Sequence, residues 1–370
     1  MLIKKAEIFH LQMPLVAPFK TSYGEMSIKH LCIVKLLSED GIEGYGELDA
    51  FEFPWYTEET TETASLIIKS HLLPQLKGLD LQNPNQMNTL FKVFRGNEMA
   101  KAAVETAIWD MFAKASNQPL ATFLGGSIGD IDVGVSIGIQ ESPEILVNVV
   151  RKYVSEGYSR VKLKIKPGSD IESVKQVRAT FPNLSLMVDA NSAYTRADIE
   201  TLKKLDKYDL AMIEQPFGTT DFVDHAWLQQ QITTPICLDE NIRSLEDAKQ
   251  ASTLQSAKAI NLKIARVGGL AEAIKIAEFC SENNMLVWCG GMYEAGIGRA
   301  HNIALASRAE FTFPGDISAS NRYFHRDIIQ NEITINNGKI ATPTNIGIGV
   351  TVDQPVLESY CTKREVIVLD

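Results

Sequence analysis

Five charged residues follow short apolar runs at nearly equal intervals along the middle of the chain. They are Lys164, Asp189, Glu214, Asp239 and Lys263, and the gaps between them are 25, 25, 25 and 24 residues. A short apolar run is typical of a buried strand, and one strand, one helix and two loops together need roughly 25 residues. The spacing therefore predicts one charge at the same end of each successive strand in a series of βα units. In a closed parallel barrel those strand ends meet at one mouth, where catalytic groups gather.

The pattern of apolar residues divides the chain at about residue 126. Residues 1–125 predict an α+β capping domain, in which a few strands precede a few helices. Residues 126–330 alternate strand and helix, which predicts an α/β fold with a barrel like that of triosephosphate isomerase (a TIM barrel). The tail, 331–370, returns to strands and turns, and we expect it to pack back on the capping domain and complete it.

The predicted elements can be placed along the chain from periodicity and turn signals. In the capping domain they are strands at Ile3–Met13, Leu31–Leu37 and Ile42–Leu48 and helices at Thr57–Leu76 and Lys101–Ala115. In the barrel they are strands at 131–139, 160–165, 184–189, 209–214, 235–239, 259–264, 285–289 and, on a weaker pattern, 309–313. In the tail they are a hairpin from Glu332 to Thr342 and a last strand at Glu365–Leu369.

Composition limits the classes of partner. The 36 basic and 46 acidic residues give a net charge of −10, which disfavours nucleic acid and anionic membrane surfaces as partners. The five cysteines are scattered and form no CxxC pair, which indicates reduced thiols. No apolar run approaches the ~18 residues of a membrane span. We therefore expect a cytoplasmic protein without nucleic-acid or membrane partners. Assembly as a homo-oligomer is a separate expectation, and the site residues described next predict a small-molecule carboxylate as the substrate.

The three carboxylates predict a metal site. Asp189, Glu214 and Asp239 supply only oxygen ligands, and no histidine or cysteine accompanies them. Such a set suits a hard cation, Mg²⁺ or Mn²⁺, with water and a substrate oxygen completing the coordination. The alternative is three separate salt bridges at a barrel rim. Asn191 and Glu240 lie just beyond the ligands, where they either support the metal site or belong to a polar rim.

The two outer lysines predict acid–base chemistry. Lys164 and Lys263 come from strands on either side of the carboxylate strands, which places them across the barrel mouth. A buried lysine near a cation and another ammonium group loses proton affinity and can act as a general base near neutral pH. Lys162 points to the same side of its strand as Lys164. The alternative is that the lysines of the 162–166 run are exposed, as lysine usually is, and we expect this for Lys166.

These residues together predict removal of a proton next to a carboxylate. A divalent cation that binds a substrate carboxylate makes the adjacent C–H acidic, because it stabilises the enediolate. One lysine would take this α-proton. The other would deliver a proton to the opposite face or stabilise the negative charge.

At these residues the chain resembles the enolase superfamily, in its muconate-lactonizing subgroup. The resemblance rests on Lys162-Leu163-Lys164, on the three carboxylates and on Lys263, and it covers essentially the full length. It implies a modified (β/α)7β barrel with a capping domain. Enzymes of that superfamily pair a lysine or histidine base with Mg²⁺ that stabilises an ene-diolate.

Three longer stretches are similar to one branch of the subgroup, the o-succinylbenzoate synthases that are close to N-succinylamino acid racemases. The stretches are Val161–Gly168, Asn261–Gly269 and Gly290–Ala300. The resemblance implies syn dehydration of 2-succinyl-6-hydroxy-2,4-cyclohexadiene-1-carboxylate to o-succinylbenzoate, a step of menaquinone biosynthesis, with Lys164 as the base. It implies that Lys263 holds the enolate by a cation–π contact or acts as the second acid–base group in racemisation.

The resemblance also implies a set of substrate contacts. Arg266 matches a form associated with racemase activity, although a strand-end arginine also suits a salt bridge, and Tyr293 stands where relatives carry an aliphatic residue. The aromatic residues of two loops before residue 57 suit either a lid over the mouth or the contact between capping domain and barrel. The candidate substrate-binding residues are Ser136, Lys162, Asn191, Arg266, Gly291, Met292, Phe19, Tyr23 and Tyr56.

Other functions remain open from the sequence. The main role could be racemisation, or the activity could be that of a muconate cycloisomerase or a dipeptide epimerase. The last would show a D-x-D pair at the final strand end, where this chain has Asp316-Ile317-Ser318. A different class is a metal-independent Schiff-base aldolase, in which lysine is a nucleophile. A barrel used only for binding would not need all three carboxylates and both lysines.

Overall fold

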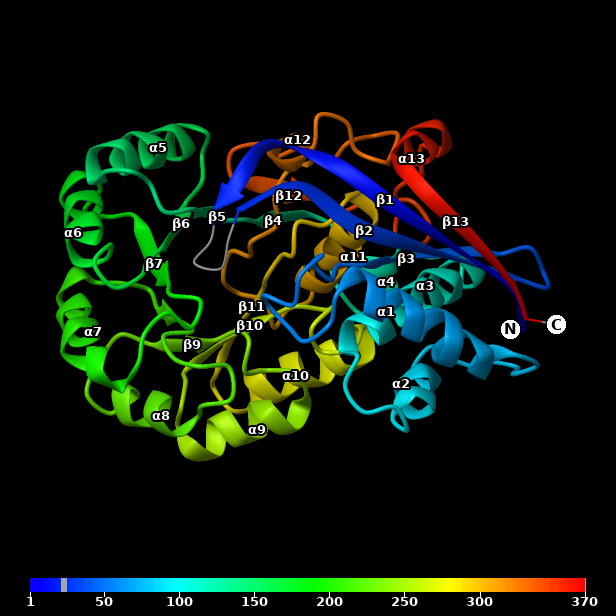
Figure 1. Cartoon of the computed structure of the whole chain (residues 1–370), viewed down its shortest axis with the longest axis horizontal. Coiled ribbons are helices and arrows are strands. Elements are labelled where there is room, and N and C mark those ends of the chain that lie inside the picture. The colour runs from blue at the N-terminus through cyan, green and yellow to red at the C-terminus, as the bar shows by residue number, and fades with distance from the viewer. Residues whose placement is uncertain (21–24, 370) are drawn as a thin grey trace.

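The structure is a computed structural model that describes residues 1–20 and 25–369. An antiparallel sheet with its helices lies beside a curled parallel sheet, and α5 to α10 wrap around the outside of the parallel sheet (Figure 1). This arrangement confirms the predicted α/β barrel with an α+β capping region. In the described part of the chain, no helix is both long and apolar enough to cross a bilayer.

The antiparallel sheet belongs to the first part of the chain and the tail. Its strand order is β13-β1-β2-β3. Its strands are β1 (Ile3–Lys20), β2 (Glu25–Ser38), β3 (Glu43–Leu48) and β13 (Cys361–Val368). Because β13 pairs with β1, and Leu369 N donates to Lys4 O at 2.9 Å, the two ends of the chain lie side by side (Figure 1). The last strand of the tail therefore belongs to the same sheet as the first strands of the chain.

Four helices belong to this part of the chain: α1 (Thr61–Ile67), α2 (Gln86–Phe91), α3 (Glu98–Ala115) and α4 (Leu120–Phe123). Helices α1 and α3 contact the sheet, and α2 and α4 contact α3. The predicted helix at 57–76 begins only at Thr61, because Thr60 and Thr63 form a capping box, and it continues as a π turn and a 3-10 turn to Leu76. Strand β3 lies very close to α3. A Cβ atom at Gly46 would lie 2.0 Å from Ala103 O, so only glycine allows this approach.

The parallel sheet has the order β11-β10-β9-β8-β7-β6-β5. Its strands are β5 (Val135–Ile137), β6 (Arg160–Lys164), β7 (Ser185–Asp189), β8 (Ile213–Glu214), β9 (Ile236–Leu238), β10 (Ala259–Leu262) and β11 (Leu286–Cys289). Its helices are α5 (Pro143–Ser155), α6 (Ile171–Thr180), α7 (Ile199–Leu205), α8 (Val223–Gln229), α9 (Leu245–Leu254), α10 (Leu270–Glu282) and α11 (Gly296–Ala306). Most strand residues are buried on both faces, as expected for a parallel sheet covered by helices.

The eighth strand, predicted at 309–313, does not form as a strand in the part of the chain that is described. Single parallel bridges join Phe311 to Val287 of β11, and Gly315 to Val133 just before β5. Pro314 between them has no N–H to donate to a ladder, which explains why the pairing stays at isolated bridges. The segment still spans the gap between the two edges of the sheet.

The predicted hairpin at 332–342 is only partly correct. Its turn forms, because Asn336 and Lys339 exchange backbone hydrogen bonds of 2.9 and 3.1 Å across Asn337 and Gly338, which have φ values of 50° and 70°. The first arm is not a strand. The second arm, β12 (Lys339–Ala341), pairs instead with β4 (Asp130–Asp132). Two short helices, α12 (Ser320–Tyr323) and α13 (Gln354–Tyr360), complete the tail region.

Candidate active site

Parallel pairing brings the predicted carboxylates to one row. Lys164 of β6 pairs with Asp189 of β7, and Asp189 pairs with Glu214 of β8. Asp239 follows the last residue of β9 directly. All three carboxylate residues are at most 1% exposed. The 25-residue spacing therefore corresponds to neighbouring strand ends.

Lys164 lies beside the first carboxylate. Its Nζ donates to Asp189 Oδ2 at 2.6 Å and to Asn191 Oδ1 at 2.5 Å. Asn191 has a positive φ of 43°, which asparagine tolerates, and its backbone N–H donates to Asp189 Oδ1 at 2.9 Å. The turn after β7 therefore fixes Asp189 and Asn191 around the amine.

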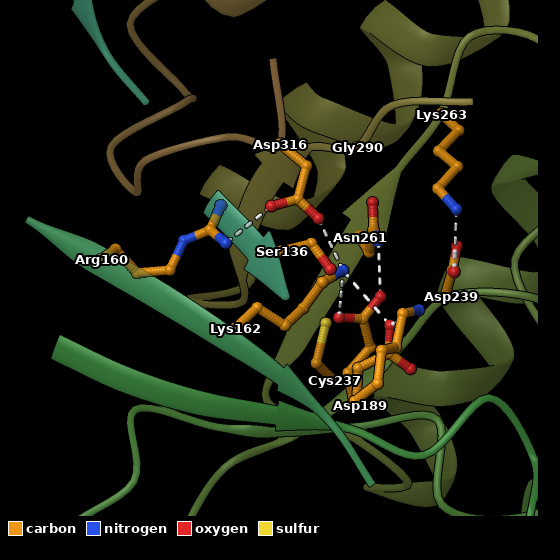
Figure 2. Close-up of polar contacts among 12 residues, drawn as sticks. Ser136, Arg160, Lys162, Asp189, Cys237, Asp239, Asn261, Lys263, Gly290 and Asp316 are labelled. Atoms are coloured by element: carbon orange, nitrogen blue, oxygen red, sulfur yellow. Dashed lines mark hydrogen bonds and ion pairs between the residues drawn. The ribbon is translucent and has the colours of Figure 1, made fainter. Parts of the chain in front are cut away.

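Lys162 is surrounded by carboxylates (Figure 2). Its Nζ lies 2.9 Å from Glu214 Oε2, 3.3 Å from Asp189 Oδ2 and 2.6 Å from Asp316 Oδ2. Burial disfavours the charged amine, but the three carboxylates outweigh burial and raise the pKa of Lys162 well above its ordinary value. The charged form of Lys162 is therefore favoured in this network.

Lys263 and Asp239 share a second network with Tyr56 of the first module, by which we mean residues 1–125 with the antiparallel sheet that they form together with β13. Lys263 Nζ donates to Asp239 Oδ2 and to the Tyr56 hydroxyl, both at 3.0 Å, and lies 4.3 Å from the centre of the Tyr56 ring. Tyr56 donates to Asp239 Oδ1 at 2.7 Å. Arg266 Nη1 donates to the same carboxylate oxygen and to the Tyr56 hydroxyl. Burial opposes ionisation of Asp239, but Lys263 and Arg266 hold its pKa well below the ordinary value.

The carboxylates fit a hard cation by their chemistry. Burial and the neighbouring charge of Asp189 raise the pKa of Glu214 to about 7, and Asp239 adds to this effect. Three acids that oppose each other's ionisation are a set that a divalent cation would stabilise. Within residues 1–20 and 25–369, however, no three His, Cys, Asp or Glu side chains form a ready-made metal cluster. Each carboxylate points instead to an amine or a guanidinium group.

One cavity brings most of the candidate residues together. It is lined by nine of the residues named from the sequence, namely Lys164, Lys263, Asp189, Ser136, Lys162, Asn191, Gly291, Met292 and Tyr56. Glu214 and Asp239 are buried next to it. Phe19 is the second-last residue of β1 and its backbone pairs with Met26, whereas Tyr23 lies outside the described residues.

Arg266 is the exception among the substrate-binding candidates. It is 1% exposed, is absent from the cavity wall, and holds Asp239, Tyr56 and the carbonyl oxygen of Ile242. A direct contact between Arg266 and substrate is therefore not supported. Its guanidinium donates to Asp239 and so holds this carboxylate in place without lining the cavity.

Three residues of this site were not identified from the sequence. Asp316 lines the cavity and binds both Lys162 and the fully buried Arg160, the latter at 2.6 Å (Figure 2). Asn261 Nδ2 donates to Glu214 Oε1 at 2.6 Å. A signal for Asn261 existed, because it precedes Lys263 by two residues, as Lys162 precedes Lys164. In the sequence, Asp316 stands out only as a departure from a D-x-D pair at the final strand end, and no pattern indicates that it binds Arg160 and Lys162.

The remaining wall of the cavity is aromatic. Trp55, Phe51, Tyr293 and Tyr323 line it, and the rings of Tyr293 and Tyr323 lie 4.6 Å apart. Tyr293 has a φ of 68°, which is unusual for a bulky residue and indicates a constrained loop. The carboxylates and amines thus lie at one side of a cavity whose other side suits an apolar substrate group.

Comparison with protein families assigns both parts of the chain. Residues 3–125 match the mandelate racemase / muconate lactonizing enzyme N-terminal domain, and residues 146–356 match the enolase C-terminal domain-like family. These two matches cover most of the chain.

Individual relatives agree with this assignment. The chain is 58% identical to an o-succinylbenzoate synthase of Listeria innocua, over 100% of this chain and 99% of the relative. It is 42% identical to an N-succinylamino acid racemase of Thermus thermophilus, over 97% of each chain. A crystal structure of an enolase superfamily member from Listeria innocua superposes with a TM-score of 0.98, at 58% identity and full coverage of both chains.

Proposed function

The chain belongs to the mandelate racemase / muconate lactonizing enzyme family of the enolase superfamily, and on that premise we propose that it is an o-succinylbenzoate synthase that also racemises N-succinylamino acids. One observation carries the proposal. Lys164 and Lys263, from β6 and from the end of β10, line the same cavity beside three buried carboxylates.

In the dehydration, Lys164 as a neutral amine takes the proton from the ring carbon that bears the carboxylate. It then gives this proton to the hydroxyl group on the adjacent carbon, which leaves as water from the same face. As a neutral amine, Lys164 can keep its two N–H donors directed at Asp189 and Asn191 and use its lone pair to accept the proton. Lys263, on the other side of the cavity, stabilises the negative charge that develops.

Racemisation uses the same first step on an N-succinylamino acid. One lysine removes the α-proton, and the other returns a proton to the opposite face of the planar anion. The presence of two amines on one cavity favours this second activity, because dehydration alone needs one acid–base group.

Asp189, Glu214 and Asp239 would hold Mg²⁺, or Mn²⁺ in its place. When bound, the cation would supply positive charge that stabilises the anion formed after proton removal. Lys162, held charged by its carboxylates, contributes a second fixed positive charge next to this position.

The substrate contacts and the wider organisation are part of the proposal. Ser136, Asn191, Gly291 and Met292 line the cavity and would contact the substrate together with Tyr56. We propose that residues 1–125 and the tail 331–370 form the capping domain and that 126–330 form the catalytic barrel. Assembly as a homo-oligomer stays a prediction, which light scattering of the purified protein would test.

The proposal is tested by measuring kcat/KM for both substrates with purified protein and Mg²⁺. Dehydration is followed by absorbance, and racemisation by exchange of the α-proton in D2O. Lys164→Ala should lower dehydration by at least about 10³-fold. Lys166→Ala, which changes an exposed lysine two residues further on, is the matched control and should keep the wild-type rate. Wild-type protein without dehydration activity, or an active Lys164→Ala variant, would reject the proposal.

A further inference from the structure

Two barrel helices begin without a side chain of their own to cap them. Helices α10 and α11 follow Gly269 and Ala295, neither of which has a side-chain acceptor. By contrast, Ser142, Asp170 and Ser244 cap α5, α6 and α9 with their own side chains. The first N–H groups of a helix have no partner inside the helix. The caps of α10 and α11 must therefore come from elsewhere.

The cap of α10 is Glu105, from helix α3 of the first module. Glu105 Oε2 accepts from Leu270 N at 2.8 Å, and Oε1 accepts from Ala271 N at 2.9 Å. Its carboxylate also accepts from Trp109 Nε1 at 2.5 Å, and the residue is 1% exposed. A Cβ atom at Gly269 would lie 2.3 Å from Glu105 Oε2, so the glycine permits the carboxylate to reach the helix.

Two carboxylates cap α11: Glu47, from strand β3 of the same module, and Asp327, which accepts from Gly296 N at 2.7 Å. Glu47 Oε1 accepts from Ala295 N at 2.6 Å, and Oε2 accepts from Gly298 N at 2.7 Å. Next to it, Glu294 accepts from Met292 N at 2.6 Å and thereby fixes the preceding loop. A carboxylate at a helix N-terminus is also favoured by the helix dipole.

These helices directly follow the loops that carry the reacting groups. The loop 263–269 joins β10 to α10 and begins with Lys263. The loop 290–295 joins β11 to α11, and Gly291, Met292 and Tyr293 of this loop line the cavity. Ala265 and Met292 are moreover packed in the hydrophobic core of the first module. That module therefore holds both loops by apolar and polar contacts.

We propose that Glu47 and Glu105 are positioning residues, which set the geometry of the catalytic loops 290–295 and 263–269 by capping α11 and α10 from the other module. This proposal rests on the function proposed above. Glu105 caps the helix that follows the loop of Lys263, whereas Lys164 lies on β6. A change at Glu105 should therefore affect Lys263 more than Lys164.

The test is exchange of the α-proton in D2O for each enantiomer of one N-succinylamino acid, with the full chain and Mg²⁺. The enantiomer whose exchange survives in Lys263→Ala reports Lys164, and the other reports Lys263. In Glu105→Gln, which keeps the size but loses the charge and one acceptor, exchange on the side of Lys263 should fall about tenfold more than on the side of Lys164. Glu47→Gln should lower kcat/KM for both substrates several-fold. It should not change the exchange ratio, which is the exchange rate on the side of Lys263 divided by that on the side of Lys164.

The matched control is Asp110→Asn on the same helix, α3. Asp110 is also a fully buried carboxylate that accepts two backbone hydrogen bonds, from Tyr45 N at 3.0 Å and Ile348 N at 2.8 Å. It contacts neither catalytic loop, so its loss should lower the melting temperature and leave the exchange ratio unchanged.

Three results would overturn this proposal, and a fourth would reject the proposed function. Equal loss on both faces in Glu105→Gln, or a shifted ratio in Asp110→Asn, would overturn the proposal. If Glu105→Gln does not fold, Trp109→Phe removes only one donor to Glu105 and should shift the ratio in the same direction by a smaller factor; an unchanged ratio there would also overturn it. Wild-type protein inactive on both substrates would instead reject the proposed function itself.

Discussion

Gly290 is a position where a single methyl group should disturb the active site without unfolding the protein. A Cβ atom there would lie 2.0 Å from Asn261 Oδ1 and 2.8 Å from Lys263 Cε. Figure 2 shows Gly290 beside these two side chains. Heavy atoms that are not bonded pack at about 3.5 Å. In Gly290→Ala, the Asn261 side chain must therefore move by more than about 1 Å. This movement displaces the Nδ2 group that donates to Glu214.

The magnitude follows from this displacement. A misplacement of about 1 Å in catalytic groups costs on the order of 10²-fold in rate, which corresponds to about 3 kcal/mol in the activation free energy. Overpacking of a core costs about 1–3 kcal/mol of folding free energy. Gly290 does not have a positive φ, so alanine adds no backbone strain there. The variant should stay folded and lose about two orders of magnitude in kcat.

The assay compares kcat for dehydration, the circular dichroism spectrum and the melting temperature of Gly290→Ala with those of Gly129→Ala. Gly129 also lacks a positive φ, and a Cβ atom there would meet nothing within 4 Å. The control should keep kcat within about twofold. A folded Gly290→Ala variant with wild-type kcat would refute the inference that Asn261 and Lys263 must keep these positions.

Three further predictions concern the metal, the acids and the pH. Chelation with EDTA should abolish both activities and added Mg²⁺ should restore them; activity that persists in EDTA would favour the aldolase alternative. Asp316→Asn should lower the free energy of unfolding in urea by about 3 kcal/mol, because Arg160 and Lys162 lose the negative charge that they both pair with. A loss below about 1 kcal/mol would contradict this. Burial raises the pKa of Glu59 from 4.5 to about 7, so its protonated form is favoured in the folded state and the wild type loses about 3 kcal/mol of stability as the pH rises from 4.5 through 7. Glu59→Gln removes this dependence, so urea unfolding at pH 4.5 and pH 8 should show the variant gaining about 2–3 kcal/mol relative to wild type at the higher pH, and an equal difference at both pH values would exclude it.

The spacing of charged residues could predict the row of acids because it depends on local chain geometry. One βα unit has nearly constant length, so Asp189 and Glu214 fall in register on neighbouring strands without any information from the rest of the chain. The period-2 rule placed Lys162 and Lys164 on one side in the same way. The role of Lys164 as the base and the role of Lys162 as a fixed charge stay proposals.

The residues that sequence reasoning missed are those whose partners are distant in sequence. Arg160 and Asp316 are 156 residues apart, and their contact depends on how the sheet edges close around Pro314. Likewise, the role of Arg266 depends on Tyr56, 210 residues earlier. A spacing rule follows one element at a time, so it cannot detect a side chain that reaches from one module into another.

The first module also holds the starts of two barrel helices. The loop 263–269 ends in Gly268 and Gly269, both with positive φ, and leads to a helix with no cap of its own. The loop 290–295 contains Tyr293 in a left-handed conformation and leads to another such helix. Each loop has some local hydrogen bonds, such as Gly269 N to Ile264 O and Met292 N to Glu294, but the first N–H groups of both helices are satisfied by distant carboxylates. A barrel without the first module would leave the N–H groups that Glu47 and Glu105 satisfy without these partners, so the contact between the two modules contributes to the geometry of both loops.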